Sequence, residues 1–234
     1  MNYIFPPVQP ASLAIHQSTQ RFAVRRVYCV GRNYADHARE MGSDPTREPP
    51  FFFCKASDAD SIITVPAGQV GRMPYPSQTQ NLHFETELVV AIGQAGVNIR
   101  RDAAAAHIFG YAIGFDMTRR DLQNDMKQGG KPWEISKAFD HAAPIGTLYP
   151  KAAVPDIHNA AITLDVNGEL RQSGNVSQMI WQIDEVIANL STYFTLQPGD
   201  LIFTGTPAGV GAVQVGDQLH AQIDGLGSLD VKIV

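Results

Sequence analysis

Two glutamates stand two residues apart in the stretch HFETELVV, residues 83 to 90. Side chains alternate across a strand, so Glu85 and Glu87 would project from one face, about 7 Å apart at ~3.3 Å of rise per residue. Two such carboxylates repel each other, and burying either one is unfavourable unless it is protonated or paired. A solvent-facing edge strand is the plainer alternative. The apolar Val89 continues the glutamate face, which favours a buried strand whose acids are neutralised.

A third acid, Asp116, closes the expected strand YAIGF immediately before a helix start. Two glutamates and one aspartate make an all-oxygen ligand set, which suits Mg²⁺ or Mn²⁺ better than zinc. Calcium is an alternative, although the chain has no EF-hand loop. Three carboxylates and one divalent cation leave a single negative charge, so surrounding cations would favour an anionic ligand. Arg120, Gln123 and Lys137 follow in the chain; each alone is commonly a surface residue, but together they favour a site.

A histidine and a glutamate lie three residues apart in VGRNYADHAREMG. We expect a helix of about two turns there, with Asn33 as its N-cap and Gly42 at its end. His37 and Glu40 would share a face of it, so the carboxylate could hold the imidazole as a general base for water. An exposed ion pair is the commoner meaning of this spacing.

Short β-prone runs and few helices make up the rest of the chain. The dipeptide Asn167-Gly168 predicts a hairpin, Thr118 and Asp121 predict a capping box for a helix ended by Gly129-Gly130, and residues 177 to 194 have the spacing of one amphipathic helix. Further strands are expected at 27–30, 51–54, 62–65, 111–115 and in the last part of the chain. Strands and helices that do not alternate strictly predict an α+β fold with a mixed or antiparallel sheet.

Composition limits the class of protein. A chain of 234 residues predicts one large domain, residues 26–234, after an extended N-terminal lead-in, residues 1–25. The net charge of −5 and the absence of any Lys/Arg cluster larger than a pair exclude a nucleic-acid binder. With no apolar run of about 18 residues and no signal peptide, we expect a cytoplasmic protein that does not bind membranes. Cys29 and Cys54 form no CxxC pair, so we expect neither a disulfide scaffold nor a thiolate zinc site.

Five motifs in order, spread over most of residues 26 to 211, resemble the fumarylacetoacetate hydrolase family. They are VGRNYADHAREMG, HFETELVVAIG, GFDMTRRDLQ, KPWEISKAFD and FTGTPAGVG. The likeness is to the small members, the acylpyruvate and fumarylpyruvate hydrolases and related oxaloacetate decarboxylases. It implies a mixed β-sheet roll with few short helices, usually a homodimer, with 26–234 as the catalytic domain.

The resemblance also implies a role for individual residues, motif by motif. Lys55 matches only loosely, because FFFCKASDA is a weak form of the family pattern. The implied metal ligands, for Mg²⁺ or Mn²⁺, are Glu85, Glu87 and Asp116. The implied catalytic residues are His37 and Glu40, which activate water, and Lys137, which stabilises an oxyanion. The implied contacts to a bound keto acid are Arg120, Gln123, Thr206 and, more weakly, Lys55.

The activity so implied is hydrolysis of a carbon–carbon bond in a 2,4-diketo acid. Fumarylpyruvate, giving fumarate and pyruvate in the breakdown of gentisate, an aromatic compound, is the preferred substrate. General acylpyruvate hydrolysis, oxaloacetate decarboxylation or tautomerisation, and dienedioate isomerisation use related chemistry. A non-catalytic metal-binding protein is the alternative from another class; it would predict loss of the base or the cations, yet His37, Glu40 and Lys137 are all present.

Overall fold

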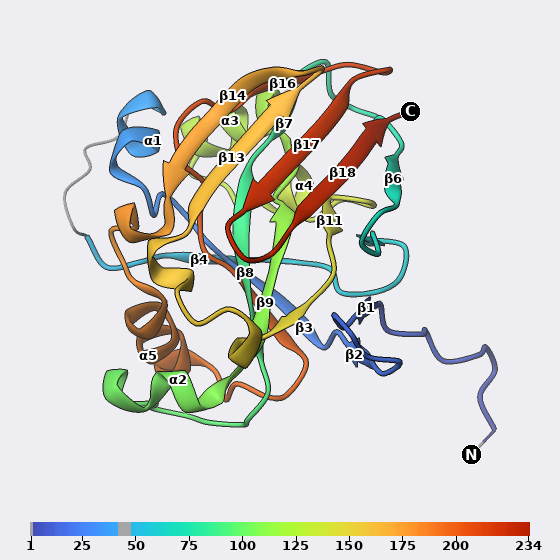
Figure 1. Cartoon of the computed structure of the whole chain (residues 1–234). Helices are drawn as coiled ribbons and strands as arrows, with labels where there is room; N and C mark the ends of the chain where they lie inside the picture. Colours follow the sequence, from blue (N-terminus) through green and yellow to red (C-terminus); the bar gives the residue numbers. More distant parts are fainter. Residues whose placement is uncertain (1, 42–47) are drawn as a thin grey trace.

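A computed structural model describes residues 2–41 and 48–234. It confirms the expected α+β fold, with mixed sheets and a few short helices (Figure 1). The α-helices are α1 (Ala35–Glu40), α2 (Ala104–His107), α3 (Arg120–Gln128), α4 (Glu134–Lys137) and α5 (Ile183–Tyr193). Short 3₁₀ turns lie at Arg101–Ala103, Lys151–Ala153, Ile157–Asn159 and Val176–Gln178. None of the helices in the described part of the chain combines the length and the hydrophobicity that a membrane span requires.

The largest sheet has the order β4-β3-β15-β8-β9-β11-β5, and β12 joins it by pairing with β9. It is mixed, because β15 runs parallel to β3 and β11 parallel to β5, whereas β8 is antiparallel to both its neighbours. Its strands are β3 (Arg26–Val30), β4 (Phe52–Lys55), β5 (Ile62–Thr64), β8 (Thr86–Ile92), β9 (Ile108–Phe115), β11 (Ala143–Ile145), β12 (Tyr149–Pro150) and β15 (Asp200–Phe203).

Three smaller sheets complete the fold. A five-stranded sheet, order β14-β13-β17-β18-β6, lies in front of β8 and β9 in Figure 1. It consists of β6 (Val70–Met73), β13 (Ala161–Val166), β14 (Glu169–Asn175), β17 (Gln218–Ile223) and β18 (Ser228–Ile233). A three-stranded sheet consists of β7 (Leu82–Phe84), β10 (Thr118–Arg119) and β16 (Gly211–Val213), and a hairpin of β1 (Ser12–Ala14) and β2 (Arg21–Ala23).

β8 is buried along its whole length. Leu88, Val90 and Ile92 pack into the larger hydrophobic core, which also takes side chains from β9 and the five-stranded sheet. Val89 and Ala91 pack into a smaller core on the opposite face. A strand covered on both faces is expected to be continuously apolar, which explains the run LVVAI. The solvent-facing edge strand is therefore excluded.

The sequence predicts one strand between residues 83 and 90, but the structure has two. β7 ends at Phe84 and pairs with β10 and β16, whereas β8 begins at Thr86 and pairs with β9 and β15. Glu85 lies between them, where the chain passes from one sheet to the other. Different pairing partners on either side of one residue explain the break, which alternation along the sequence does not reveal.

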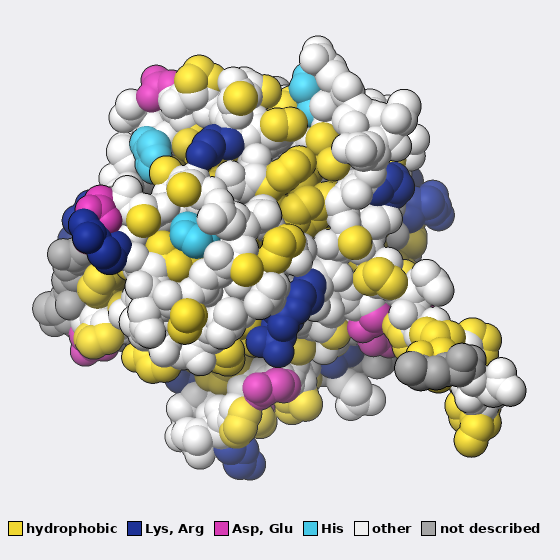
Figure 2. All heavy atoms as spheres, turned by 90° about the horizontal axis from the view of Figure 1, so that it is seen from below, with side chains coloured by type: hydrophobic (Ala, Val, Ile, Leu, Met, Phe, Trp, Pro, Cys, Tyr) yellow, Lys and Arg dark blue, Asp and Glu magenta, His cyan; other side chains and the backbone are white. Residues whose placement is uncertain are grey.

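The N-terminal lead-in contains the β1–β2 hairpin, whose Leu13 and Phe22 pack into the smaller core. Before the hairpin an extended segment leaves the body of the protein and carries exposed Ile4, Phe5 and Val8 (Figures 1 and 2). The Asn167-Gly168 hairpin is confirmed between β13 and β14, with positive φ at both turn residues.

The prediction of one helix over 177–194 is wrong for the first part of that range. A 3₁₀ turn with Asn175 as its cap comes first, and α5 begins only at Ile183, after a capping box of Gln182 and Glu185.

Candidate functional site

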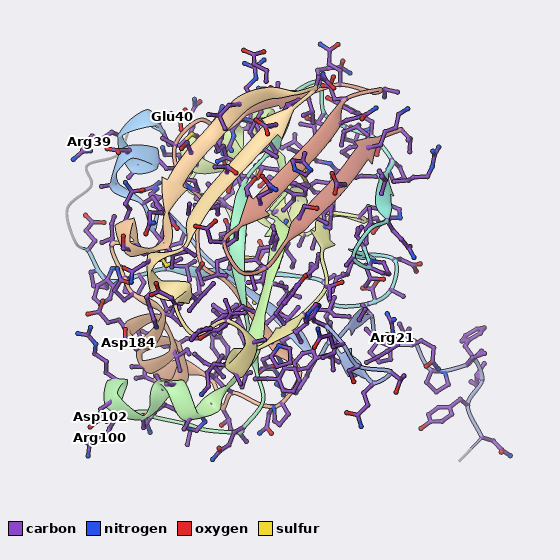
Figure 3. The ribbon with its side chains drawn as sticks, in the orientation of Figure 1. Arg21, Arg39, Glu40, Arg100, Asp102 and Asp184 are labelled. Atoms are coloured by element: carbon purple, nitrogen blue, oxygen red, sulfur yellow. The ribbon has the colours of Figure 1, made fainter. Side chains whose placement is uncertain are left out.

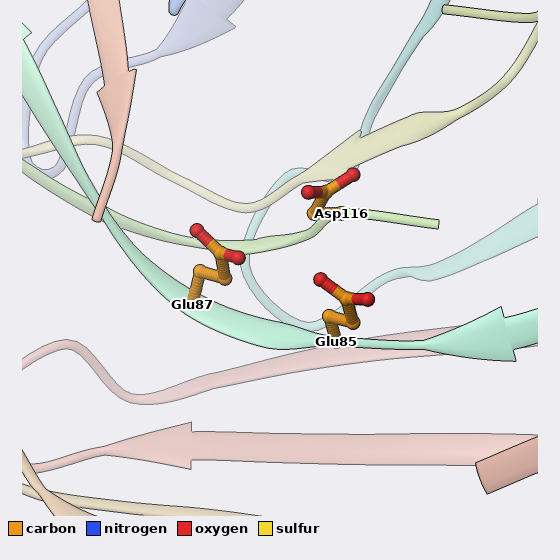
Figure 4. A group of neighbouring side chains, drawn as sticks. All are labelled: Glu85, Glu87 and Asp116. Carbon is orange, nitrogen blue, oxygen red and sulfur yellow. The ribbon is translucent and has the colours of Figure 1, made fainter. Parts of the chain in front are cut away.

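Three acidic side chains form one buried cluster at the end of the largest sheet. Oxygen atoms of Glu85, Glu87 and Asp116 lie within 4.8 Å of one another. Figure 4 shows the two glutamates projecting from the β8 region toward Asp116, which follows β9. The backbone holds this arrangement, because the amide of Asp116 donates to the carbonyl of Glu85 over 2.9 Å. The fold thus brings together the acids that the sequence predicts as metal ligands.

Two lysines neutralise Asp116. Lys137 Nζ lies 2.9 Å from Asp116 Oδ2 and 3.0 Å from Glu85 Oε2. Lys55 Nζ lies 2.7 Å from Asp116 Oδ1, in an ion pair whose angles do not make a hydrogen bond, and donates to the carbonyls of Met117 and Lys137. Both ammonium groups are buried. Lys55, predicted to contact substrate, therefore reaches the site through Asp116.

Arg120 binds Glu85 from α3. Its Nη2 lies 2.5 Å from Glu85 Oε1, and its Nη1 donates to Gln123 Oε1, so the Gln123 amide nitrogen is left for the pocket that both side chains line. Arg120 Nε also donates to His83 Nδ1 over 3.4 Å. Burial, reinforced by the neighbouring Arg120, lowers the pKa of His83 to about 4, so His83 is a neutral acceptor that holds the guanidinium.

The two glutamates have opposite pKa shifts. Burial alone would raise the pKa of Glu85, but Lys137 and Arg120 outweigh it and hold that pKa well below its usual range. Burial raises the pKa of Glu87 well above its usual range, and the charges of Asp116 and Glu85 add to the effect. Its carboxyl accepts one hydrogen bond, from the Gly205 amide over 2.7 Å. Without a further cation, Glu87 therefore keeps its proton to a higher pH than a free glutamate does.

A divalent cation fits this donor set. Three carboxyl groups meet three cations here, Lys55, Arg120 and Lys137. All three cations bind Glu85 or Asp116, and none pairs with Glu87. Carboxylate oxygens this close together suit a hard cation, which would replace the proton of Glu87. The site is thus a candidate divalent-metal centre.

Thr118 belongs to this cluster, which corrects its expected role as a helix N-cap. It lies in β10, and α3 begins at Arg120 with no side-chain cap. The Thr118 hydroxyl donates to Glu85 Oε1 over 3.2 Å and accepts from Lys137 Nζ over 2.7 Å. Asp121, the expected partner in the capping box, accepts instead from Thr79 and the Gln80 amide. These tertiary contacts override the local capping pattern.

His37 and Glu40 lie on α1, as predicted, and His37 lines the pocket. His37 Nδ1 lies 3.3 Å from Glu40 Oε2, and both Glu40 oxygens accept from the Gly209 amide over 3.2 Å. Figure 3 shows Glu40 at the end of α1. Because the carboxylate takes a hydrogen from Nδ1, Nε2 is the free acceptor of the ring. Burial lowers the pKa of His37, and the charges of Glu85 and Glu40 oppose this only in part, so the imidazole is neutral at pH 7.

The sequence predicts Asn33 as the N-cap of α1, but the structure shows that it is not. The helix begins after Tyr34, whose side chain caps nothing. The Asn33 amide instead accepts from the Trp181 amide over 2.7 Å and donates to the carbonyls of Trp181 and Thr204. This ties the start of the His37 helix to the loop after β15. Gly42, the expected helix end, lies outside the described residues.

Thr206 lines the pocket from the loop after β15, and the buried Gln172 of β14 holds it there. Gln172 Nε2 donates to Thr206 Oγ1 and to the Pro207 carbonyl, each over 2.8 Å. In the same loop Gly205 has φ of +97°, a region that favours glycine. A Cβ on Gly205 would lie 2.7 Å from Asn33 Cβ. Loop and helix therefore pack closely at the site.

One pocket, which opens to solvent, collects most of these residues. Of the predicted site residues, His37, Glu85, Glu87, Asp116, Arg120, Gln123, Lys137 and Thr206 line it. Glu40 and Lys55 act on it through His37 and Asp116. Sequence reasoning missed Thr118, His83 and Gln172. His83 lies two residues before Glu85 in the motif HFETELVVAIG, which is a local signal, whereas nothing near Gln172 in the sequence marks it.

Known proteins share this chain's sequence and fold. A family model described as fumarylacetoacetate (FAA) hydrolase, C-terminal, matches residues 26–234. The crystal structure of fumarylpyruvate hydrolase from Pseudomonas aeruginosa, in complex with Mn²⁺ and pyruvate, is 57% identical with a TM-score of 0.96 and covers 100% of this chain and 99% of that one.

Two curated relatives have different activities in their names. A fumarylpyruvate hydrolase from a Ralstonia species is 42% identical over 192 residues, which are 81% of this chain and 95% of the relative. A mitochondrial oxaloacetate tautomerase of Rattus norvegicus is 44% identical over 209 residues, 89% of this chain and 91% of the relative. The matched range includes the acid cluster, the His37 helix and the Thr206 loop. The chain therefore belongs to the fumarylacetoacetate hydrolase family.

Proposed function

We propose that the protein is a metal-dependent hydrolase that cleaves a carbon–carbon bond of a 2,4-diketo acid. The preferred substrate is fumarylpyruvate, which gives fumarate and pyruvate. One observation carries the proposal: a buried, neutral imidazole and a three-carboxylate cluster line the same pocket. Hydrolysis needs both a base for water and a site for the keto acid. The fumarylpyruvate hydrolases among the relatives support this choice of substrate.

Glu85, Glu87 and Asp116 would hold the cation, Mg²⁺ or Mn²⁺. When bound, it supplies charge that attracts the 2-oxo acid end of the substrate and polarises its carbonyl. The neighbour with Mn²⁺ and pyruvate supports this placement of a keto acid. The protein's own part is to place cations beside two of the acids: Arg120 and Lys137 contact Glu85, and Lys55 and Lys137 contact Asp116. Glu87, which none of them contacts, would lose its proton when the metal binds.

His37 is the general base in this proposal. Its Nε2 takes a proton from the water that attacks the distal carbonyl of the substrate, while Glu40 holds Nδ1 and stabilises the imidazolium that forms. A pKa below the usual range keeps the ring unprotonated before the reaction. The short link from Glu40 to the Gly209 amide keeps the imidazole in the pocket.

Lys137 lies in the pocket and contacts two of the acids, Glu85 and Asp116. Its ammonium stabilises the negative charge that develops on the attacked carbonyl oxygen, and Gln123 and Thr206 add hydrogen-bond donors. The bond between this carbonyl carbon and the methylene group then breaks. The acyl part leaves as the carboxylate of fumarate, and the methylene carbon takes the electron pair and a proton to become the methyl group of pyruvate.

Oxaloacetate tautomerisation is a second candidate, favoured by the relative that carries this name. It moves a proton between carbon and oxygen and requires no attacking water. Oxaloacetate would bind in the same pocket. The two activities therefore differ not in the site but in the need for His37, which hydrolysis requires as a base for water. A non-catalytic metal-binding protein is disfavoured, because the imidazole and all three cations are in place.

Removing the metal tests the proposal. The protein is stripped with chelator, and loss of fumarylpyruvate is followed by absorbance before and after Mg²⁺ or Mn²⁺ is restored. We expect turnover to vanish and to return with the metal. Unchanged turnover without metal would contradict the mechanism.

Replacing His37 tests the proposed base. The rate of fumarylpyruvate hydrolysis should fall about 100-fold or more in a His37→Ala variant. If the same variant converts oxaloacetate at the parental rate, that reaction does not use His37 as a base.

The remaining expectations belong to the same proposal. A homodimer, as the family resemblance implies, would show twice the chain mass of 25.5 kDa in light scattering. Cytoplasmic location and a place in aromatic catabolism are tested by fractionation of the source cells and by growth on gentisate after deletion of the gene.

A further inference from the structure

Two cations line the same pocket without binding its acids. Arg32 follows β3 and Lys127 lies in the last turn of α3. In the described residues neither forms an ion pair with a carboxylate. Lys55, Arg120 and Lys137, by contrast, are all bound to Glu85 or Asp116. Arg32 and Lys127 are thus a separate pair of positive charges.

Helix α3 runs from the acid cluster toward the pocket's edge. Arg120, Gln123 and Lys127 follow each other at spacings of three and four residues and so share one face. Arg120 binds Glu85, while Lys127 Nζ donates to the carbonyl of Met41 over 3.2 Å, just beyond α1. Seven residues of helix correspond to about 10 Å. Lys127 therefore marks the far end of the pocket, away from the acids.

The backbone and an aromatic ring hold Arg32 at this end. Its φ is +55°, which is uncommon for a residue with a side chain. Its guanidinium lies 5.6 Å from the centre of the Phe51 ring, and Phe51 in turn meets Trp133 edge to face at 5.4 Å. A guanidinium that lies over an aromatic ring is held in position by the ring, and its N–H groups stay available to bind a ligand.

The wall between the acids and these two cations is largely apolar. Phe53, Trp133 and Met41 line it, and Phe53 packs close to Trp133, at 5.9 Å between ring centres. An apolar wall with charge at each end fits a molecule with a hydrocarbon segment between two anionic groups. A monocarboxylic diketo acid would leave Arg32 and Lys127 without a counter-charge.

We propose that Arg32 and Lys127 bind the second carboxylate of the substrate and select diketo acids with an acid group at both ends. The inference rests on the proposed function and assigns specificity residues for it. Fumarylpyruvate has the required distal carboxylate on an unsaturated chain, and acetylpyruvate ends in a methyl group. Binding of the distal end places the attacked carbonyl beside His37.

The test compares kcat/KM for fumarylpyruvate and for acetylpyruvate in the parent protein and in Arg32→Gln and Lys127→Met. A charge-assisted hydrogen bond contributes about 10-fold or more, so each variant should lose at least about 10-fold of the preference for fumarylpyruvate. Arg32→Lys should keep part of it. Lys131→Met is the matched control, because Lys131 is exposed and does not line the pocket; its preference should stay at the parental value.

Inhibition by pyruvate distinguishes loss of binding to the distal carboxylate from a general disruption of the pocket. Pyruvate has only the end that the acids and the metal bind, so its inhibition constant should stay within about twofold in both variants. An unchanged preference, or an equal loss for both substrates with weaker inhibition by pyruvate, would overturn the inference and leave the proposed function standing. A parent protein that hydrolyses neither diketo acid would overturn the proposed function and the inference with it.

Discussion

Gln172 donates a hydrogen bond from Nε2 to Thr206 Oγ1 over 2.8 Å. Its Oε1 accepts from the Thr86 amide, and Nε2 also donates to the Pro207 carbonyl. An amide nitrogen only donates and a carbonyl only accepts, so these two backbone partners determine which way the side-chain amide points. Thr206 must then accept from Gln172, which leaves the hydroxyl hydrogen of Thr206 for the pocket. Gln172 thus makes Thr206 a donor toward an anionic ligand.

Removing the Thr206 hydroxyl should weaken binding of the keto acid. Thr206→Val keeps the shape of the side chain and should raise the KM for fumarylpyruvate about 10-fold, while Thr206→Ser should stay close to the parent. Gln172→Leu should raise KM by a similar factor, because the hydroxyl is then free to turn away. Steady-state kinetics of the three variants check this.

The double variant with Gln172→Leu and Thr206→Val separates the two roles. If Gln172 acts through Thr206, its replacement should add little once the hydroxyl is gone, so the effects on KM should be far from additive. Fully additive effects would show that Gln172 only supports the fold and would contradict the inferred polarity of Thr206.

Replacing Glu40 should shift the acidic limb of the kcat/KM–pH profile to lower pH. In the proposed mechanism the neutral form of His37 is the base, so kcat/KM at saturating metal should fall as pH drops through the pKa of His37, which lies below the usual 6.5. The Glu40 charge raises that pKa. Glu40→Gln should therefore move the acidic limb to still lower pH while it reduces the maximal rate.

Asp36→Asn is the control for this profile, because Asp36 lies on the same helix but pairs with Arg39 at the surface. Its acidic limb should match the parent. A limb that moves upward in Glu40→Gln would show that Glu40 does not raise the pKa of the catalytic group, and His37 would lose its assigned role.

Metal binding should release about one proton from Glu87. The pKa of this carboxyl is raised above its usual range by burial and by its acidic neighbours, so the metal-free protein keeps the proton at pH values where a free glutamate would be ionised. Affinity for Mn²⁺ should rise about tenfold per pH unit until that raised pKa is passed. Calorimetry in buffers of different ionisation enthalpy measures the proton.

A Glu87→Gln variant is the counterpart. It should lose Mn²⁺ affinity and proton release together. It should also melt at a higher temperature than the metal-free parent at neutral pH, since the raised pKa of Glu87 means that its carboxyl destabilises the folded parent above the pH at which a free glutamate ionises. Parental Mn²⁺ affinity in this variant would remove Glu87 from the ligand set.

Lys137 should be important for both rate and stability. Lys137→Met removes the positive charge that is proposed to stabilise the oxyanion, so kcat should fall about 100- to 1000-fold. It also leaves Glu85 and Asp116 with one buried cation fewer, which should cost about 3 kcal/mol of unfolding free energy in the metal-free protein. Lys131→Met, at an exposed lysine, should change neither. Turnover within twofold of the parent would exclude Lys137 from the chemistry.

The acid cluster could be predicted from the sequence because each acid is marked locally. Glu85 and Glu87 interrupt an apolar run, and Asp116 closes a strand that becomes the antiparallel partner of β8. The ordered motifs then supplied His37 and Glu40. Short-range information was sufficient where a residue's own flanking sequence marks it, as at these three acids.

The contacts that local patterns misjudged are long-range ones. Asn33 and Thr118 both have the residue type of a helix N-cap, but Asn33 binds Trp181 and Thr118 binds Glu85 and Lys137. Gln172 stands in an ordinary polar hairpin strand, and its partner Thr206 is 34 residues away. Such positions are determined by which sheets pack together, and no spacing within the sequence reports that packing.

The most direct test of the central claim is a comparison of kcat/KM for fumarylpyruvate, acetylpyruvate and oxaloacetate, measured side by side with saturating Mg²⁺ and then with Mn²⁺. We expect fumarylpyruvate to have the highest value with either metal, and fumarate and pyruvate to form in equal amounts. Rapid conversion of oxaloacetate by a protein that leaves fumarylpyruvate intact would contradict the account and identify the site as that of a tautomerase.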